Sequence, residues 1–125
     1  MPRPIGGRRS AARSGNCPDA GDLIWIDLDP TKGHEQRGRR PALVVSRATY
    51  NRRTELCVAC PITSQAKGHP FEVVIPAGQP VTGVVLADHV RSISWAARNA
   101  EIKGTAPAVV LDEVRAKIAA LIGID

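Results

Sequence analysis

Apolar and polar residues alternate along the chain from Gly21 onwards in short segments, which is the pattern of β-strands. Residues 22–28 place Ile24, Ile26 and Leu28 on one face and Leu23, Trp25 and Asp27 on the other, the two-residue period of a strand. Residues 41–45 form a second, fully apolar segment behind Pro41, which suits the start of a strand. Similar patterns predict further strands over residues 54–62, 71–75, 82–93 and 98–103.

The end of the chain has a different, helical period. Apolar residues recur there at three- and four-residue intervals, at Val110, Leu111, Val114, Ile118, Leu121 and Ile122. Thr105 is a candidate cap, Pro107 suits the first turn, and Gly123 is placed to end the helix. Short strands followed by one helix predict a mainly β fold with a C-terminal helix, a small SH3-like antiparallel β-barrel.

The length and local composition predict one domain behind an arm. A chain of 125 residues has room for a single core. Residues 1–20 are rich in Arg, Pro, Gly and Ser and have almost no apolar periodicity, so burial cannot offset the entropy of ordering them. We therefore expect a disordered basic arm over residues 1–20 and the folded domain over residues 21–125.

The positive charge is concentrated in one stretch. The formal net charge is +5, and residues 32–53 carry seven basic side chains against Glu35 alone. Such a stretch favours a polyanion such as a nucleic acid as the partner, with binding that weakens as salt rises. A solvated basic loop is the alternative interpretation of the same charges.

Nothing in the sequence predicts a membrane span or a secretory signal, so we expect a cytoplasmic protein. The cysteines are Cys17, Cys57 and Cys60. In a strand, Cys57 and Cys60 point to opposite faces and cannot close a metal site by themselves. We expect buried free thiols and no metal.

Two loops carry candidate chemistry. RNA can be cut without a metal if its own 2′-OH attacks the adjacent phosphate, which requires a proton acceptor and cations for the developing charge. Glu35 and Arg40, at the loop before the second strand, match these needs, although such a pair is more often a surface ion pair. Residues 63–70 offer hydroxyl, amide and ammonium groups suited to phosphates and base edges, or form a simple polar turn. The three histidines, His34, His69 and His89, have no metal-binding spacing.

Four runs of sequence resemble the MazF/PemK toxins in the same order. The first is GDLIWIDLDPTKGHEQ followed by GRRPALVVS, at residues 21–36 and 38–46. The others are residues 62–73, residues 83–93 and the terminal run at residues 114–123. The resemblance therefore covers about residues 21–123.

The resemblance implies a homodimer of SH3-like barrels that acts as a toxin of a toxin-antitoxin pair. Members of this family are metal-independent endoribonucleases that need no cofactor. They cleave single-stranded RNA, including mRNA, at a short sequence and leave 2′,3′-cyclic phosphate and 5′-hydroxyl ends, which inhibits translation and growth. A cognate antitoxin with an acidic tail is the implied protein partner.

The resemblance also implies roles for single residues. By motif position Arg40 and Thr63 are catalytic, with Glu35 contributing. An arginine scarcely gives up its proton, so Arg40 suits charge stabilisation and Glu35 is the better candidate base, although the assignment of general acid and base stays open. The implied RNA-binding residues are Lys32, Gln36, Arg39, Ser64, Gln65, Lys67 and Arg91.

Two other functions remain as alternatives. A gyrase-poisoning toxin shares this fold but ends in a Trp-Gly-aliphatic tail, whereas residues 121–125 are LIGID. A noncatalytic RNA-binding module would explain the basic stretch but not the full set of catalytic motifs. The sequence does not predict which RNA sequence is recognised.

Overall fold

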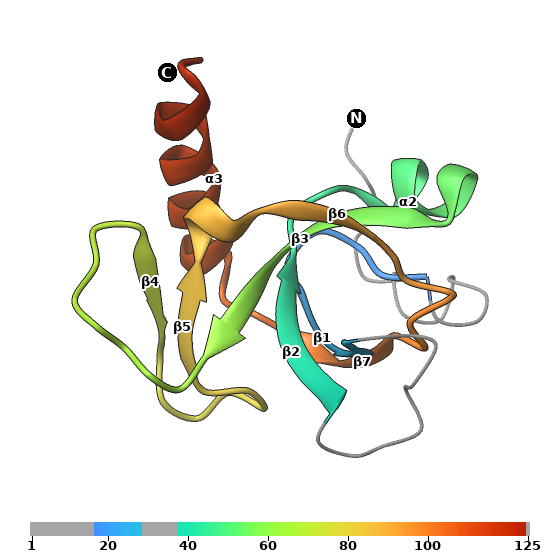
Figure 1. The fold of residues 1–125 in the computed structure, drawn as a ribbon, viewed down its shortest axis with the longest axis horizontal. Coiled ribbons are helices and arrows are strands. Elements are labelled where there is room, and N and C mark those ends of the chain that lie inside the picture. The colour runs from blue at the N-terminus through green and yellow to red at the C-terminus, as the bar shows by residue number, and fades with distance from the viewer. Residues whose placement is uncertain (1–16, 29–37, 125) are drawn as a thin grey trace.

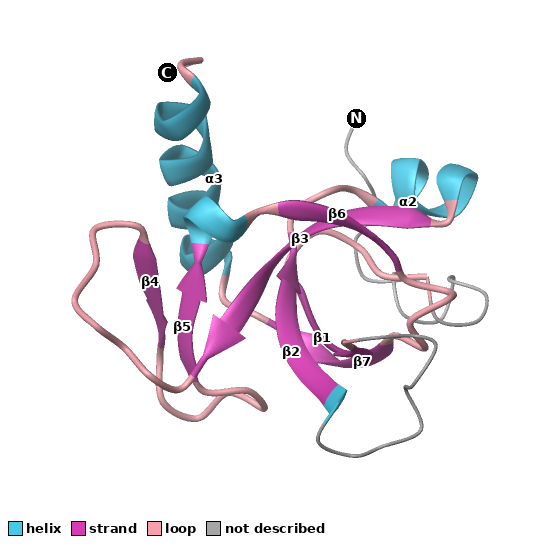
Figure 2. Cartoon of the chain, in the orientation of Figure 1, coloured by secondary structure: helices cyan, strands magenta, loops and turns pink. Residues whose placement is uncertain are grey.

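A computed structural model describes residues 17–28 and 38–124. Within these ranges the strands are β1 (Asp22–Asp27), β2 (Arg39–Val44), β3 (Leu56–Thr63), β4 (Glu72–Ile75), β5 (Gly83–Leu86), β6 (Arg91–Ser94) and β7 (Glu101–Thr105). The helices are α2 (Ala48–Thr54), the short 3-10 turn η4 (Ala87–His89) and α3 (Ala108–Ile122). The predicted mainly β fold with a C-terminal helix is confirmed (Figure 2).

All strand pairs in the described ranges are antiparallel, and β3 connects the two halves of the sheet. The order is β4-β5-β3-β2-β1-β7, with β6 also paired to β3. The first half of β3 pairs with β6, its middle pairs with β2, and its last two residues, Ile62 and Thr63, pair with β5. Figure 1 shows the resulting arrangement, with β4 and β5 beside α3 at one end of the molecule and β1, β2 and β7 at the other.

The alternation along the strands fills two apolar clusters. Leu43, Cys60 and Ile62 belong to a cluster that α3 closes with Val110 and Val114. The opposite faces of the same strands contribute to a second cluster, whose buried members are Ile24, Ile26, Ala42, Val44, Cys57, Ala59, Ile93 and Ala100. Both faces of β1, β2 and β3 are therefore buried, as the continuous apolar runs indicate.

The predicted burial of the cysteines is confirmed. Cys57 and Cys60 lie in different clusters, on opposite faces of β3, and all three cysteines are buried. Burial raises the pKa of both the Cys57 and the Cys60 thiols to about 12. These thiols therefore stay protonated near neutral pH and act as small apolar groups.

Several element boundaries differ from the predictions. The single strand predicted over residues 82–93 is wrong, because the chain turns at η4, where the buried Ala87 donates its N–H to the Phe71 carbonyl. The last strand lies at Glu101–Thr105 and not at residues 98–103, since a turn with Asn99 in the left-handed region (φ 53°) precedes it. Turning the chain in this way lets β6 pair with the first half of β3.

The ends of α3 are partly as predicted. Gly123 ends the helix in the left-handed conformation (φ 83°) with its N–H bonded to the Ala119 carbonyl, as expected. Thr105 is not its cap. It closes β7, and its hydroxyl donates to the Asp22 carboxylate at 3.3 Å, while Pro107 takes the N-cap position.

The predicted end of the N-terminal arm is wrong for residues 17–20. Cys17 and Pro18 are buried, and Asp19 accepts a hydrogen bond at 2.8 Å from the N–H of Ala48 at the start of α2. Residues 1–16 of that arm lie outside the described residues. Two apolar residues, Cys17 and Pro18, are too few to show the period of a strand or a helix, so the sequence pattern does not predict their burial.

Asn51 connects residues 17–20 to the rest of the domain by hydrogen bonds. It is a fully buried polar residue on α2, a helix that the sequence pattern did not predict. Its amide donates to the carbonyls of Pro18 (2.8 Å) and Ser46 (3.0 Å) and accepts from the Ser46 hydroxyl at 2.6 Å. One buried side chain thus satisfies polar groups in two segments that are far apart in sequence.

We predict that Asn51→Ala lowers the free energy of unfolding by about 2–4 kcal/mol, because it leaves several buried polar groups without partners. Urea denaturation followed by circular dichroism measures this loss. Arg52→Ala, on the exposed side of the same helix, is the control and should stay within about 0.5 kcal/mol of the parent. A loss below about 1 kcal/mol for Asn51→Ala would contradict the role given to this side chain.

Candidate active site

Arg40 on β2 and Thr63 on β3 both lie just beyond the same end of the β2–β3 ladder. The last pairs of that ladder are Leu43 with Cys60 and Ala42 with Pro61. Continued by two residues, the same register would place Arg40 opposite Thr63, but in the structure Thr63 pairs with Val84 of β5. Because side chains two residues apart on a strand share a face, both lie on the face that Ala42 occupies. Two candidate residues that are 23 positions apart in the chain therefore follow the same end of this ladder.

The position of Thr63 depends on a close approach of β5. Gly83 begins β5 with a φ of +123°, and a Cβ at this position would stand 2.3 Å from the Thr63 carbonyl oxygen. No other residue type fits there without moving β3 or β5. The Thr63 hydroxyl oxygen accepts a hydrogen bond at 3.1 Å from the N–H of Gln65. This bond uses an acceptor site of the hydroxyl and none of its donor capacity.

The loop after Thr63 is exposed but internally held. Ser64, Gln65 and Lys67 are all exposed. The Glu72 carboxylate accepts from the backbone N–H of Lys67 (2.9 Å) and of Gly68 (3.1 Å). At the end of the loop the ammonium of Lys117, on α3, donates to the Pro70 carbonyl at 2.7 Å. The three predicted RNA-binding side chains therefore project from a braced loop.

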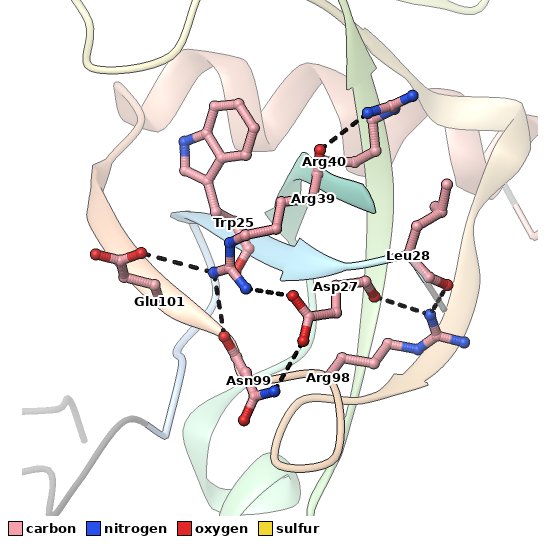
Figure 3. A network of polar contacts seen from close by, with 8 residues as sticks. All are labelled: Trp25, Asp27, Leu28, Arg39, Arg40, Arg98, Asn99 and Glu101. Atoms are coloured by element: carbon pink, nitrogen blue, oxygen red, sulfur yellow. Dashed lines mark hydrogen bonds and ion pairs between the residues drawn. The ribbon is translucent and has the colours of Figure 1, made fainter. Parts of the chain in front are cut away.

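Arg39 is not placed like the other predicted RNA-binding residues, since its guanidinium is directed into the protein (Figure 3). It donates to Asp27 Oδ1 at 2.5 Å and to the carbonyls of Trp25 at 3.3 Å and Asn99 at 3.2 Å. The exposed carboxylate of Glu101 lies 3.6 Å away. We call Asp27, Arg39, Arg98 and Asn99 the Asp27 cluster.

Asp27 is the buried centre of this cluster. It is 2% exposed, and its second carboxylate oxygen accepts from the Asn99 amide at 2.8 Å. The hydrogen bond from Asn99, together with the bond and positive charge of Arg39, lowers the pKa of Asp27 below its ordinary value, against the opposing effect of burial. Asp27 therefore remains a carboxylate at neutral pH.

The same cluster joins the two ends of the segment between β1 and β2. Arg98 donates to the carbonyls of Asp27 and Leu28, and the Leu28 N–H bonds to the Gly38 carbonyl at 2.5 Å. Residues 29–37 between these ends, with the predicted site residues Lys32, Glu35 and Gln36, lie outside the described residues.

Arg91 lies further from the pair formed by Arg40 and Thr63. It is an exposed residue at the start of β6 and pairs with Ala59, four positions before Thr63 on β3. At the usual rise of a strand this corresponds to about 13 Å along β3. The backbone of Arg91 therefore lies well away from Thr63 along β3.

The remaining candidates for acid–base or metal chemistry are peripheral. His69 and His89 are exposed, and His89 lies 3.8 Å from the Asp88 carboxylate. Across residues 17–28 and 38–124 no three His, Cys, Asp or Glu side chains are grouped to hold a metal ion. No helix in the same ranges is long and apolar enough to cross a membrane.

Comparison with known proteins connects this geometry to a family. The family model described as PemK-like, MazF-like toxin of type II toxin-antitoxin system matches residues 19–122. The chain belongs to the PemK/MazF toxin family. This assignment confirms the resemblance carried by the four sequence runs.

Curated relatives and solved structures agree with the family model. The chain is 56% identical over 106 residues to the endoribonuclease toxin MazF of Escherichia coli K12, covering 85% of this chain and 95% of the relative. It is 35% identical over 118 residues to the Escherichia coli endoribonuclease PemK, covering 91% and 89%. A MazE-MazF crystal structure from Deinococcus radiodurans superposes with a TM-score of 0.80 at 52% identity, covering 89% of this chain and 100% of that one.

Sequence reasoning about this PemK/MazF-family chain missed four residues that shape the site: Asp27, Gly83, Asn99 and Glu72. A signal existed for Asp27, because a carboxylate in an otherwise apolar strand is unusual and must be paired when buried. The other three had no local signal. Their partners lie in segments whose contact with them is decided by the fold.

We predict that Asp27 contributes to the acid sensitivity of the fold. A carboxylate whose pKa is lowered on folding stabilises the protein fully above its unfolded pKa of about 4, and this contribution is lost as the pH falls through the folded value. The free energy of unfolding should therefore fall between about pH 5 and pH 2, and less steeply in Asp27→Asn. Urea titrations at several pH values test this, and identical slopes for both proteins would refute it.

Proposed function

We propose that this chain is the endoribonuclease toxin of a toxin-antitoxin pair and that it cleaves single-stranded RNA at a specific short sequence. The observation that carries the proposal is membership of the PemK/MazF family, and the position of Arg40 and Thr63 just beyond the same end of the β2–β3 ladder supports it. The names of the relatives, endoribonuclease MazF and endoribonuclease PemK, support the same activity.

In the proposed mechanism the substrate supplies its own nucleophile. The ribose 2′-OH loses its proton to a base and attacks the adjacent phosphorus, and the P–O5′ bond breaks. The leaving 5′ oxygen takes a proton from a general acid or from water, so that the products carry a 2′,3′-cyclic phosphate and a 5′-hydroxyl. Negative charge grows on the nonbridging oxygens as the phosphorane forms. A fixed cation and a fixed hydrogen-bond donor stabilise that charge, and this route uses no metal ion.

Each proposed catalytic residue has one task. The Arg40 guanidinium offers a planar set of donors to two phosphate oxygens, because such geometry matches a phosphate in two places. The Thr63 hydroxyl donates to a nonbridging oxygen and orients the phosphate for in-line attack. Glu35 removes the 2′-OH proton. The exposed loop with Ser64, Gln65 and Lys67, together with Lys32, Gln36 and Arg91, binds the flanking nucleotides.

Arg39 has a different role in this proposal from the one its position in the motif suggests. Its guanidinium already has partners on Asp27, Trp25 and Asn99 and is only 22% exposed. Binding RNA through this group would require breaking the ion pair with Asp27 and the hydrogen bonds to the two carbonyls. Arg39 therefore supports the strand and does not contact bases.

The proposed partners follow from the family and from charge. The active form is a homodimer, and the cognate antitoxin places an acidic tail on the surface that binds RNA. The basic residues of the 32–53 stretch would attract such a tail and RNA in the same way. In this proposal the antitoxin inhibits by occupying the substrate site; the related MazE-MazF crystal structure from Deinococcus radiodurans supports an antitoxin partner. The proposed location of both proteins is the cytoplasm.

The reaction class is tested by mapping cleavage ends on a long transcript in excess EDTA. We expect cuts at one short sequence, 2′,3′-cyclic phosphate and 5′-hydroxyl ends, and no cutting of duplex RNA. A substrate with a single 2′-deoxynucleotide before the scissile phosphate should resist cleavage, because it lacks the nucleophile. Equal cutting of DNA, or a requirement for added divalent metal, would overturn the mechanism.

The site assignment is tested by substitution. We expect Arg40→Ala to lower kcat at least about 100-fold, the usual effect of removing a transition-state donor, and Thr63→Val to lower it at least about 10-fold. Arg52→Ala removes one positive charge from the same basic stretch at an exposed site on α2 and serves as the matched control. Full activity of both site variants would refute the assignment, and an equal loss in the control would reduce it to a general charge effect.

A further inference from the structure

Arg39 and Arg40 are neighbours with opposite orientations. The Arg39 guanidinium enters the Asp27 cluster, whereas the Arg40 guanidinium extends away from it (Figure 3). One hydrogen bond connects the two residues, since Arg40 Nη1 donates to the Arg39 carbonyl oxygen at 3.0 Å. Any shift of the Arg39 backbone is therefore passed to the guanidinium proposed to meet the phosphate.

The Arg39 backbone is held from both sides. Its strand pairs with β1, with Arg39 opposite Asp27 and Arg40 opposite Ile26. Its side chain is bonded to the same Asp27 and to the Asn99 carbonyl. Backbone pairing alone leaves the end of a strand free to fray, so the side-chain bonds decide how firmly this end is fixed.

Asn99 completes the arrangement with both its backbone and its side chain. Its carbonyl accepts from Arg39 while its amide donates to Asp27 Oδ2. The left-handed backbone of Asn99, φ 53°, directs these two groups into the cluster. Asparagine is among the few residues other than glycine that adopt this conformation readily.

We propose that Asp27 and Asn99 are positioning residues for RNA cleavage, which hold Arg39 and through its carbonyl set the direction of the Arg40 guanidinium. The proposal rests on the proposed function and extends it to residues that touch no substrate. A displacement of about 1 Å in a group that stabilises the transition state lowers kcat by up to about 100-fold. A purely structural role would lower stability and leave kcat unchanged.

Three variants separate these roles. In the parent protein, one Asp27 oxygen accepts from Arg39 and the other accepts from Asn99. Asp27→Asn replaces one of these oxygens with an NH₂ group, so that two hydrogen-bond donors face each other at one of the two contacts. Asn99→Gly removes the amide but keeps the left-handed backbone at low cost. The double variant Asp27→Asn, Asn99→Asp again pairs every donor with an acceptor. The amide NH₂ at position 27 can donate to the carboxylate at position 99, and the amide oxygen at position 27 can accept from Arg39. The double variant also keeps the net charge.

We expect both single variants to lower kcat about 10- to 100-fold with KM within about threefold of the parent. The double variant should recover most of that loss. Asn51→Ala is the matched control, since it weakens the fold through a side chain that bonds to Pro18 and Ser46 and to no member of the cluster. Measured below its unfolding temperature, it should retain the parent kcat. Parent kcat in both single variants, or no recovery in the double variant, would overturn the positioning role.

A spectroscopic readout separates this proposal from the proposed function. The Nε–Hε resonance of Arg40, assigned through its loss in Arg40→Lys, reports the order of the guanidinium without any substrate. We expect it to shift and broaden in Asp27→Asn and Asn99→Gly and to return in the double variant. If the parent protein cleaved no RNA, the proposed function would fail. An unchanged resonance would defeat the positioning proposal, even in a protein that cleaves RNA.

Discussion

Strand β3 is hydrogen-bonded to β2, β5 and β6 within eight residues, and the other parts of the site depend on this sharing. To serve three partners the strand must change neighbours along its length. Its first half pairs with β6, its middle pairs with β2, and its end pairs with β5. Thr63 is therefore held at the point where the β2 ladder has ended and the β5 ladder has begun.

This constraint explains several features that look unrelated in the sequence. Gly83 is required because β5 approaches Thr63 too closely for any side chain. The turn at η4 is required because the chain must leave β5 and reach the far end of β3 as β6. Alternation along β3 sends Cys57 and Ala59 into one cluster and Cys60 and Ile62 into the other. A single strand thereby joins both cores and carries a candidate catalytic hydroxyl.

The two adjacent arginines have different roles. Arg39 bonds to groups inside the protein, and Arg40 is the residue proposed to bind the phosphate. A guanidinium has five donors in a fixed plane, and the donors that already satisfy acceptors inside the protein are not available to a phosphate. Arg39 takes the first role through Asp27, and the pKa of that carboxyl is held low by Asn99 and Arg39. Arg40, one residue later, faces the other side of the strand. Alternation of side chains on a strand is sufficient to produce this division.

The sequence by itself determined the mainly β class, the C-terminal helix with its Gly123 end, the burial of the cysteines and the family, because these depend on local periodicity and on long motifs. It also singled out Arg40 and Thr63. Only the tertiary structure decided that Arg39 is an internal partner of Asp27, that residues 17–20 belong to the domain, and that residues 82–93 form two strands. Each of these depends on contacts between segments far apart in the chain, and a local pattern records the burial of a residue but not the identity of its partner.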